Sequence, residues 1–143
     1  MCATSRDQIE DGEHEVDEDV AYRKMGIFYQ HTYMLMGAYE LYKEDGQYLP
    51  LGDHECKSGE KVQLLKLRNP HARNEWKGDW SDTDHERWTP ELNEYFKHKD
   101  EDDGEFFMEL GDFMKYYDHF SICEYYPGYK TSSFRYETQK NQL

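Results

Sequence analysis

Cysteine is scarce in this sequence of 143 residues, and long hydrophobic runs are absent from it. Cys2, Cys56 and Cys123 are far apart and form no Cys-x-x-Cys pair, which argues against a disulfide framework or a cysteine-based zinc site. The seven histidines include no His-Glu-x-x-His pair, so a zinc hydrolase of that type is disfavoured. No apolar run approaches the roughly 18 residues of a transmembrane helix, and residues 1–10 lack the apolar core of a signal peptide. We therefore expect a cytoplasmic chain with reduced thiols.

Basic residues are also in the minority. Lysine and arginine number 17 against 31 acidic residues, so the net charge is -14. Nucleic-acid binding and a basic membrane-binding patch need clustered positive charge, and both are disfavoured. Divalent cations are the natural partners of such a charge distribution. Apolar residues make up only 36% of the chain, so we expect the core to depend on its 13 Tyr, 7 Phe and 3 Trp.

The charge divides the chain into three parts. Residues 1–20 carry eight acidic side chains against Arg6, a density that predicts a mostly disordered, solubilising tail. Residues 21–126 contain the apolar patterns and are expected to form one domain. Residues 127–143 are polar and are expected to form a C-terminal tail.

The domain is expected to be α+β and rich in strands, with two short helices. In 26–39 both alternating series are largely apolar, which predicts a strand buried on both faces that contains His31. A helix is expected to begin at Thr89-Pro90-Glu91, because a hydroxyl cap, a proline and an early acid favour a helix start. A turn is expected at 44–46, and 48–61 reads as a loop or an inserted hairpin. The further expected elements are strands over 39–43, 62–68, 105–110 and 119–125, and a short helix after 111–112.

His31 and Asn69 are the first candidate site. In thiol hydrolases an imidazole is the base, and a third group must fix its tautomer and orientation. An asparagine carbonyl accepts a hydrogen bond from the imidazole without adding charge. His31 and Asn69 form such a pair if their strands are neighbours. The alternative is that His31 is an ordinary histidine of the core, which is the more common case.

Acidic residues form the second candidate site. Glu75 and Asp82 flank a tryptophan-rich turn, and the run 101–105 adds four more carboxylates around Gly104. Calcium takes six to eight oxygen ligands from carboxylates and carbonyls of irregular backbone. The spacing does not match an EF-hand loop. The alternative is a solvated acidic loop that binds nothing.

Several ordered motifs resemble the calpain family of cysteine proteases. They are Leu65-Lys66-Leu67-Arg68-Asn69-Pro70, the run 75–82, the run 101–108 with Asp112-Phe113, and Gly26-Ile27-x-x-x-His31-x-Tyr33. The similarity covers about residues 24–123 and matches the C-terminal half of the protease core. It implies the twisted antiparallel sheets of a papain-like subdomain.

The resemblance also implies roles for individual residues. His31 would be the base and Asn69 its orienting partner in a Cys-His-Asn triad. The side chains of Glu75, Asp82, Asp103 and Glu105, with the carbonyl of Glu101, would bind one Ca²⁺. Calcium in that family aligns the two halves of the core, so it acts as a conformational gate and not as a reactant.

The sequence departs from the family pattern in three respects. We find no N-terminal half with a nucleophile, because none of the three cysteines has the helix and cation context of a reactive thiolate. The family's Asn-Pro-Trp-Gly is replaced by Asn-Pro-His-Ala at 69–72. Without the tryptophan, the hydrogen bond between His31 and Asn69 is expected to be more exposed to water and therefore weaker. Gln30 and Thr32 replace the usual Gly and Ala beside His31, and extra residues lie around 48–60.

Two functions follow as hypotheses. The first is a calpain-type half core that carries His and Asn but no nucleophile and is inactive alone. Its partner would be an N-terminal calpain half or a full calpain, and protein substrates would be cleaved only after complementation. The second is a non-catalytic calcium-binding module with a regulatory or structural role. A third interpretation, an adaptor that binds through Trp76, Trp80 and Trp88, leaves the ordered motifs unexplained.

Overall fold

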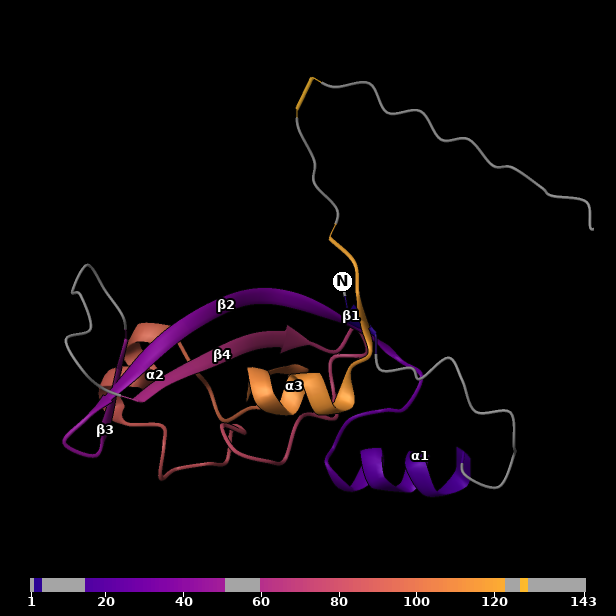
Figure 1. Ribbon diagram of the computed structural model, residues 1–143, viewed down its shortest axis with the longest axis horizontal. Coiled ribbons are helices and arrows are strands. Elements are labelled where there is room, and N and C mark those ends of the chain that lie inside the picture. Colours follow the sequence, from indigo (N-terminus) through magenta and orange to yellow (C-terminus); the bar gives the residue numbers. More distant parts are fainter. Residues whose placement is uncertain (1, 4–14, 51–59, 123–126, 129–143) are drawn as a thin grey trace, which may run out of the picture.

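The computed structural model describes residues 2–3, 15–50, 60–122 and 127–128 of the chain (Figure 1). Within these residues, no helix has the length and apolar character needed to cross a membrane. The elements in chain order are β1 (Cys2–Ala3), α1 (Glu15–Lys24), β2 (Thr32–Glu44), β3 (Gln47–Pro50), β4 (Glu60–Arg68), α2 (Pro90–Phe96), β5 (Glu105–Glu109), α3 (Leu110–Tyr116) and β6 (His119–Phe120).

The described strands form one antiparallel sheet. Its order is β5-β4-β2-β1-β6, and β3 pairs with the far end of β2 as a hairpin. The long, curved β2 runs beside β4, and these two strands form the centre of the sheet (Figure 1). A change of register between Leu35 and Gly37 interrupts the pairing of β2 with β4, as a β-bulge does. The chain is therefore an α+β fold with a curved antiparallel sheet, as its sequence predicts.

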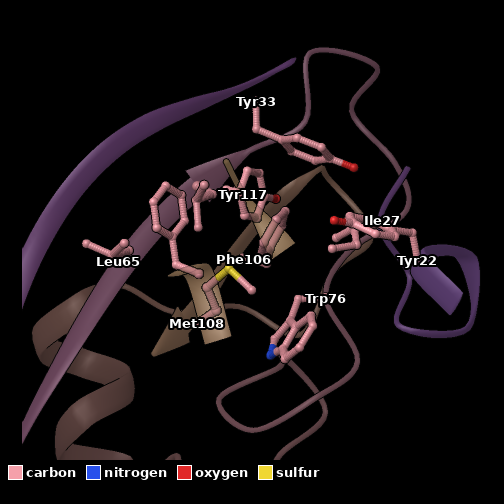
Figure 2. Packing of buried hydrophobic residues seen from close by; sticks show 10 residues of the cluster. Tyr22, Ile27, Tyr33, Leu65, Trp76, Phe106, Met108 and Tyr117 are labelled. Carbon is pink, nitrogen blue, oxygen red and sulfur yellow. The ribbon is translucent and has the colours of Figure 1, made fainter. Parts of the chain in front are cut away.

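Both faces of β4 are covered by aromatic side chains. Leu65 and Leu67 of β4 point to one face, and Val62 and Leu64 point to the other. The first face packs against Trp76 and Ile27, as Figure 2 shows. The second face packs against Trp80, Trp88 and the apolar side of α2. The large rings thus supply the core that the low aliphatic content requires.

Helix α2 begins where the sequence places it, whereas α3 begins at Leu110, before the expected start after 111–112, and shortens the strand expected over 105–110 to Glu105–Glu109. Thr89 caps α2, because its hydroxyl accepts a hydrogen bond from the N–H of Leu92 at 3.3 Å. The helix α3 follows β5 directly. An additional helix, α1, begins at Glu15, inside the stretch expected to be a disordered tail. The hydroxyl of Tyr22 on α1 donates to the carbonyl of Tyr116 at 2.8 Å, which anchors the helix to the domain.

Other expectations need correction. The strand expected over 26–39 begins only at Thr32, so His31 precedes β2 and is not set into it. The same strand continues without a break to Glu44, so the separate strand expected over 39–43 does not exist. Three apolar residues of β2, Met34, Leu35 and Met36, are exposed, so it is not buried on both faces. The turn at 44–46 is present, and the described part of the last strand is limited to His119–Phe120. Residues 4–14, 51–59 and 129–143, which belong to the expected tails and loop, lie outside the described residues.

Candidate active site and acidic cradle

His31 lies at the end of a tight turn that leads into β2. The N–H of Phe28 donates to the hydroxyl of Tyr33 at 2.9 Å, which closes this turn. The rings of Phe28 and Tyr33 meet the imidazole edge-to-face at 5.6 and 5.0 Å. Tyr33 is itself completely buried. The imidazole is therefore held between a turn and a fixed core ring, which restricts its rotation.

Asn69 follows the last residue of β4 and is completely buried. Its N–H donates to the carbonyl of Gly104 at 2.7 Å. Its side-chain Nδ2 donates to the carbonyls of Arg73 at 2.7 Å and Asn74 at 3.4 Å. Pro70 has no N–H and ends the strand at this point. With the amide nitrogen committed to two carbonyls, the amide oxygen must face the opposite direction.

The amide oxygen faces His31. Nε2 of His31 lies 3.0 Å from Oδ1 of Asn69, which also accepts the backbone N–H of His71 at 3.0 Å. Because Oδ1 only accepts, Nε2 must carry the proton and donate it. Nδ1 of the neutral ring is then the nitrogen that can take up a proton. A buried asparagine thus sets the tautomer that a general base needs.

His71 lies beside the His–Asn pair. Its ring is stacked on that of His31, with centroids 4.8 Å apart and planes inclined by 25°. It stands where the resembling family carries tryptophan, and we expected its loss to expose the His–Asn bond. A flat ring is still present over His31, and Asn69 remains buried. The imidazole of His71 thus packs on one face of the His31 ring.

Two residues beside the pair have left-handed backbone. Gln30 has φ 50° and Ala72 has φ 51°. At both positions the resembling family has glycine, which adopts such angles without steric cost. Side chains other than glycine lose about 1–2 kcal/mol in this region. Both positions therefore carry a conformational cost that glycine would not have.

The acidic residues lie on two loops that meet at Gly104. Oε1 of Glu75 accepts the N–H of Gly104 at 2.6 Å, and Oδ1 of Asp102 accepts the N–H of Asn74 at 3.0 Å. Asp82 lies close enough to Glu75 to raise the pKa of its carboxyl group. We use the name acidic cradle for the side chains of Glu75, Asp82, Asp103 and Glu105 with the carbonyl of Glu101.

The cradle residues differ in their present partners. Asp82 is buried and lies 3.2 Å from Nε2 of His98. Glu105, the first residue of β5, is ion-paired with Lys66 at 2.7 Å. The carbonyl of Glu101 accepts the N–H of Asp103 at 2.9 Å. Within the described part of the chain, no three His, Cys, Asp or Glu side chains are gathered as a metal-binding cluster. The structure thus brings Glu75 and Asp82 together and leaves Glu105 on the ammonium group of Lys66.

The donor chemistry still fits a hard divalent cation. The cradle offers carboxylate and carbonyl oxygens from irregular backbone, which is the ligand type that calcium takes. Burial raises the pKa of Glu75 to about 7, and the nearby carboxylates of Asp82 and Asp102 add to this effect. Neighbouring carboxylates that repel each other in this way are also groups that a cation would stabilise. The residues therefore fit calcium in kind.

The raised pKa of Glu75 has a consequence for stability. Its ordinary value is 4.5, so between pH 4.5 and about 7 the folded chain holds a proton that the unfolded chain has released. The free energy of unfolding must fall as the pH rises through this interval. Between pH 5 and 8 we expect the free energy of unfolding of Glu75→Gln to decrease by about 1 kcal/mol less than that of the wild type. This value is reduced from the full effect of the pKa shift because the side chain is partly exposed to solvent.

Urea denaturation at pH 5 and pH 8 with chelator present measures this difference. Glu86→Gln, which removes an exposed carboxyl group of the following loop, is the control and keeps the wild-type pH dependence. A Glu75→Gln chain with the same pH dependence as the wild type would contradict the raised pKa.

Some residues of the site are not evident from the sequence. Tyr33 and Phe28 support His31, and Gly104 joins Asn69 to Glu75. His98 lies against Asp82 and is stacked on Trp88 with centroids 4.0 Å apart. The glycine between the acids of 101–105 is an available sequence signal, because a turn between carboxylates needs it. Tyr33 belongs to the motif around His31, and for Phe28 and His98 the pattern contains no signal.

Comparison with known proteins identifies the family of the chain. The family model described as "Calpain family cysteine protease" matches residues 1–124. Calpain-12 of Mus musculus is 41% identical over 86 residues, which are 56% of this chain and 11% of that protein. Calpain-9 of Rattus norvegicus is 38% identical over 71 residues, 48% of this chain and 10% of that protein. The calpain-1 catalytic subunit of Mus musculus is 40% identical over 72 residues, again 48% and 10%. The matched region is thus about a tenth of these relatives, and the chain belongs to the calpain family of cysteine proteases.

Proposed function

We propose that the chain is the half of a calpain-type protease core that supplies the base and its orienting residue. The observation that carries this proposal is the 3.0 Å contact between Nε2 of His31 and Oδ1 of Asn69. His31 would take the proton of a cysteine thiol at Nδ1 and later return it to the leaving amine. Asn69 would hold the ring in the tautomer that leaves Nδ1 as the acceptor.

The thiolate must come from another polypeptide segment. None of the three cysteines has the sequence context of a reactive thiolate, because no helix start and neighbouring cation accompany it. Cys56 and Cys123 lie outside the described residues. An imidazole without a nucleophile has no proton to accept from one, so residues 1–143 alone are expected to be inactive as a peptidase. An N-terminal calpain core half that carries the cysteine is the partner that completes the triad.

The acidic cradle would hold one Ca²⁺ through Glu75, Asp82, Asp103 and Glu105, with the carbonyl of Glu101. The ion would supply positive charge that holds the two cradle loops together. The chain's own contribution is the backbone of Gly104, which is bonded to Glu75 on one side and to Asn69 on the other. Order in the cradle therefore favours order at the residue that orients His31.

Complementation tests this function. The chain alone and the chain mixed with a cysteine-bearing calpain N-terminal half are incubated with an unfolded protein substrate in excess calcium. We expect cleavage only in the mixture, and we expect thiol alkylation to abolish it. The positive control is the same N-terminal half mixed with the C-terminal half of an active calpain.

Two results would contradict the proposal. Activity in the positive control without activity in the mixture would show that His31 and Asn69 do not serve a protease. This result would favour the non-catalytic calcium-binding module. Cleavage by the chain alone, sensitive to alkylation, would show that it already contains a nucleophile.

A further inference from the structure

A lysine side chain lies among the carboxylates of the acidic cradle. Lys66 is on β4 and pairs in register with Phe107 of β5. Its Nζ atom lies 2.7 Å from Oε2 of Glu105 and 5.5 Å from the centre of the Phe107 ring. The side chain is only 22% exposed. The ammonium group is therefore held in one place by an ion pair and by a cation–π contact.

The ammonium group faces the same hollow as the cradle. This hollow has a volume of about 240 Å³, and Lys66, Asp82, Asp103 and Glu105 are among its lining residues. Lys97 and Lys99 also line it, but both are exposed, and Lys99 pairs at 3.8 Å with the side chain of Glu101, whose carbonyl is the expected ligand. Lys66 is thus the lysine that occupies a carboxylate of the cradle itself.

A bound calcium ion and this ammonium group compete for Glu105. Calcium needs carboxylate oxygens at about 2.3–2.6 Å. One oxygen of Glu105 already lies 2.7 Å from Nζ of Lys66, and the other lies 3.9 Å from the guanidinium group of Arg68. A divalent ion at Glu105 would have to displace the ammonium group and would then repel it across a few ångströms.

We propose that Lys66 is a built-in cation that occupies the acidic cradle in place of calcium and lowers its affinity for the ion. This inference rests on the calcium site in the proposed function and adds to it a residue that sets the affinity. The ion pair keeps Glu105 neutralised without calcium. Removal of the ammonium group leaves a more negative cradle, and its affinity for calcium must rise.

Calorimetric titration of calcium into the full chain tests this role. Lys66→Met removes the charge but keeps an unbranched apolar side chain against Phe107. The control is Lys61→Met, which removes a charge from the same strand, where Lys61 pairs with Glu40 at 3.5 Å outside the hollow. We expect Lys66→Met to bind calcium at least about tenfold more tightly than the wild type, and Lys61→Met to change the affinity less than about twofold.

The outcomes separate this inference from the proposed function. Calcium binding of equal or lower affinity in Lys66→Met overturns the role of Lys66 and leaves the calcium site in place. If none of the three chains binds calcium, both the role of Lys66 and the proposed calcium site are overturned. Lys66→Gln is the second neutral variant, and circular dichroism establishes that each variant is folded. A larger rise in melting temperature on calcium addition for the Lys66 variants than for the wild type supports the inference independently.

Discussion

Replacement of His31 by alanine is expected to lower the peptidase activity of the complemented core by at least about 10⁴-fold. The loss is this large because a thiol without a base is mostly protonated near neutral pH and the leaving amine has no proton donor. Substrate binding depends on other surfaces, so we expect the decrease in kcat/KM to come mainly from kcat. Initial rates on a peptide substrate, with the two halves at saturating concentration, measure this effect.

The control for this substitution is His85→Ala. The side chain of His85 is 76% exposed and lies in the loop before α2, where it pairs with Asp100 at 4.0 Å. It is expected to leave the recovered activity unchanged. If His31→Ala retained more than about a tenth of the wild-type rate, His31 would not be the base.

Replacement of Gly104 by alanine is expected to lower the free energy of unfolding by about 3 kcal/mol. Gly104 has φ +88°, and an added Cβ would lie 2.7 Å from Cα of Ala72 and 2.9 Å from the carbonyl oxygen of Asn69. Both neighbours are backbone atoms, which cannot rotate away as a side chain does. The substitution therefore combines an unfavourable backbone angle with a steric clash.

Gly46 provides a matched control. It has φ +84° in the hairpin between β2 and β3, and an added Cβ would have no atom within 4 Å. Gly46→Ala is expected to lower the free energy of unfolding by only about 1 kcal/mol, which is the cost of the left-handed backbone angle without a steric clash. Urea denaturation of the two variants isolates the clash at Gly104. Equal losses in both variants would show that the two loops do not approach each other as closely as the structure has them.

Gly104→Ala is also expected to affect the site. Displacement of the carbonyl of Gly104 removes the hydrogen bond to the N–H of Asn69, and displacement of its N–H frees Glu75. Recovered peptidase activity should therefore fall together with stability, whereas Gly46→Ala should keep full activity.

The central strands could be predicted from the sequence because their patterns have clear ends. In β4 the alternation of residues 62–67 places apolar side chains on both faces, and Asn69-Pro70 ends the strand. The cap at Thr89 and the turn before Gly46 are equally local signals. Each depends on residues that are neighbours in the chain, and each was placed correctly.

The start of β2 and the presence of α1 could not be predicted in this way. Residues 27–31 are largely apolar and aromatic because they pack into the core as a turn, and a periodic pattern cannot distinguish this from a strand. Gln30 adopts a left-handed angle that glutamine does not signal. The acidic residues of 15–20 suggested repulsion, whereas the contact of Tyr22 with Tyr116 that anchors α1 is long-range. The start of β2 and the presence of α1 thus both depend on long-range contacts.

The residues of the candidate site also fall into two groups, those indicated by local motifs and those that depend on long-range packing. Motif resemblance indicated the residue types at positions 31 and 69, and the structure places their side chains 3.0 Å apart. The contributions of His71, Gly104 and Lys66 depend on packing between distant segments. Apart from the glycine between the acids, their positions in the sequence therefore carry no signal of these roles.

The left-handed angles of Gln30 and Ala72 have one more consequence. Each residue stands next to the His–Asn pair in a conformation that its own side chain disfavours. The local peptide therefore resists the arrangement, and the surrounding core imposes it. A short peptide copied from residues 26–33 would relax to another shape, so the orientation of the imidazole is a property of the assembled domain and is lost when that domain loosens.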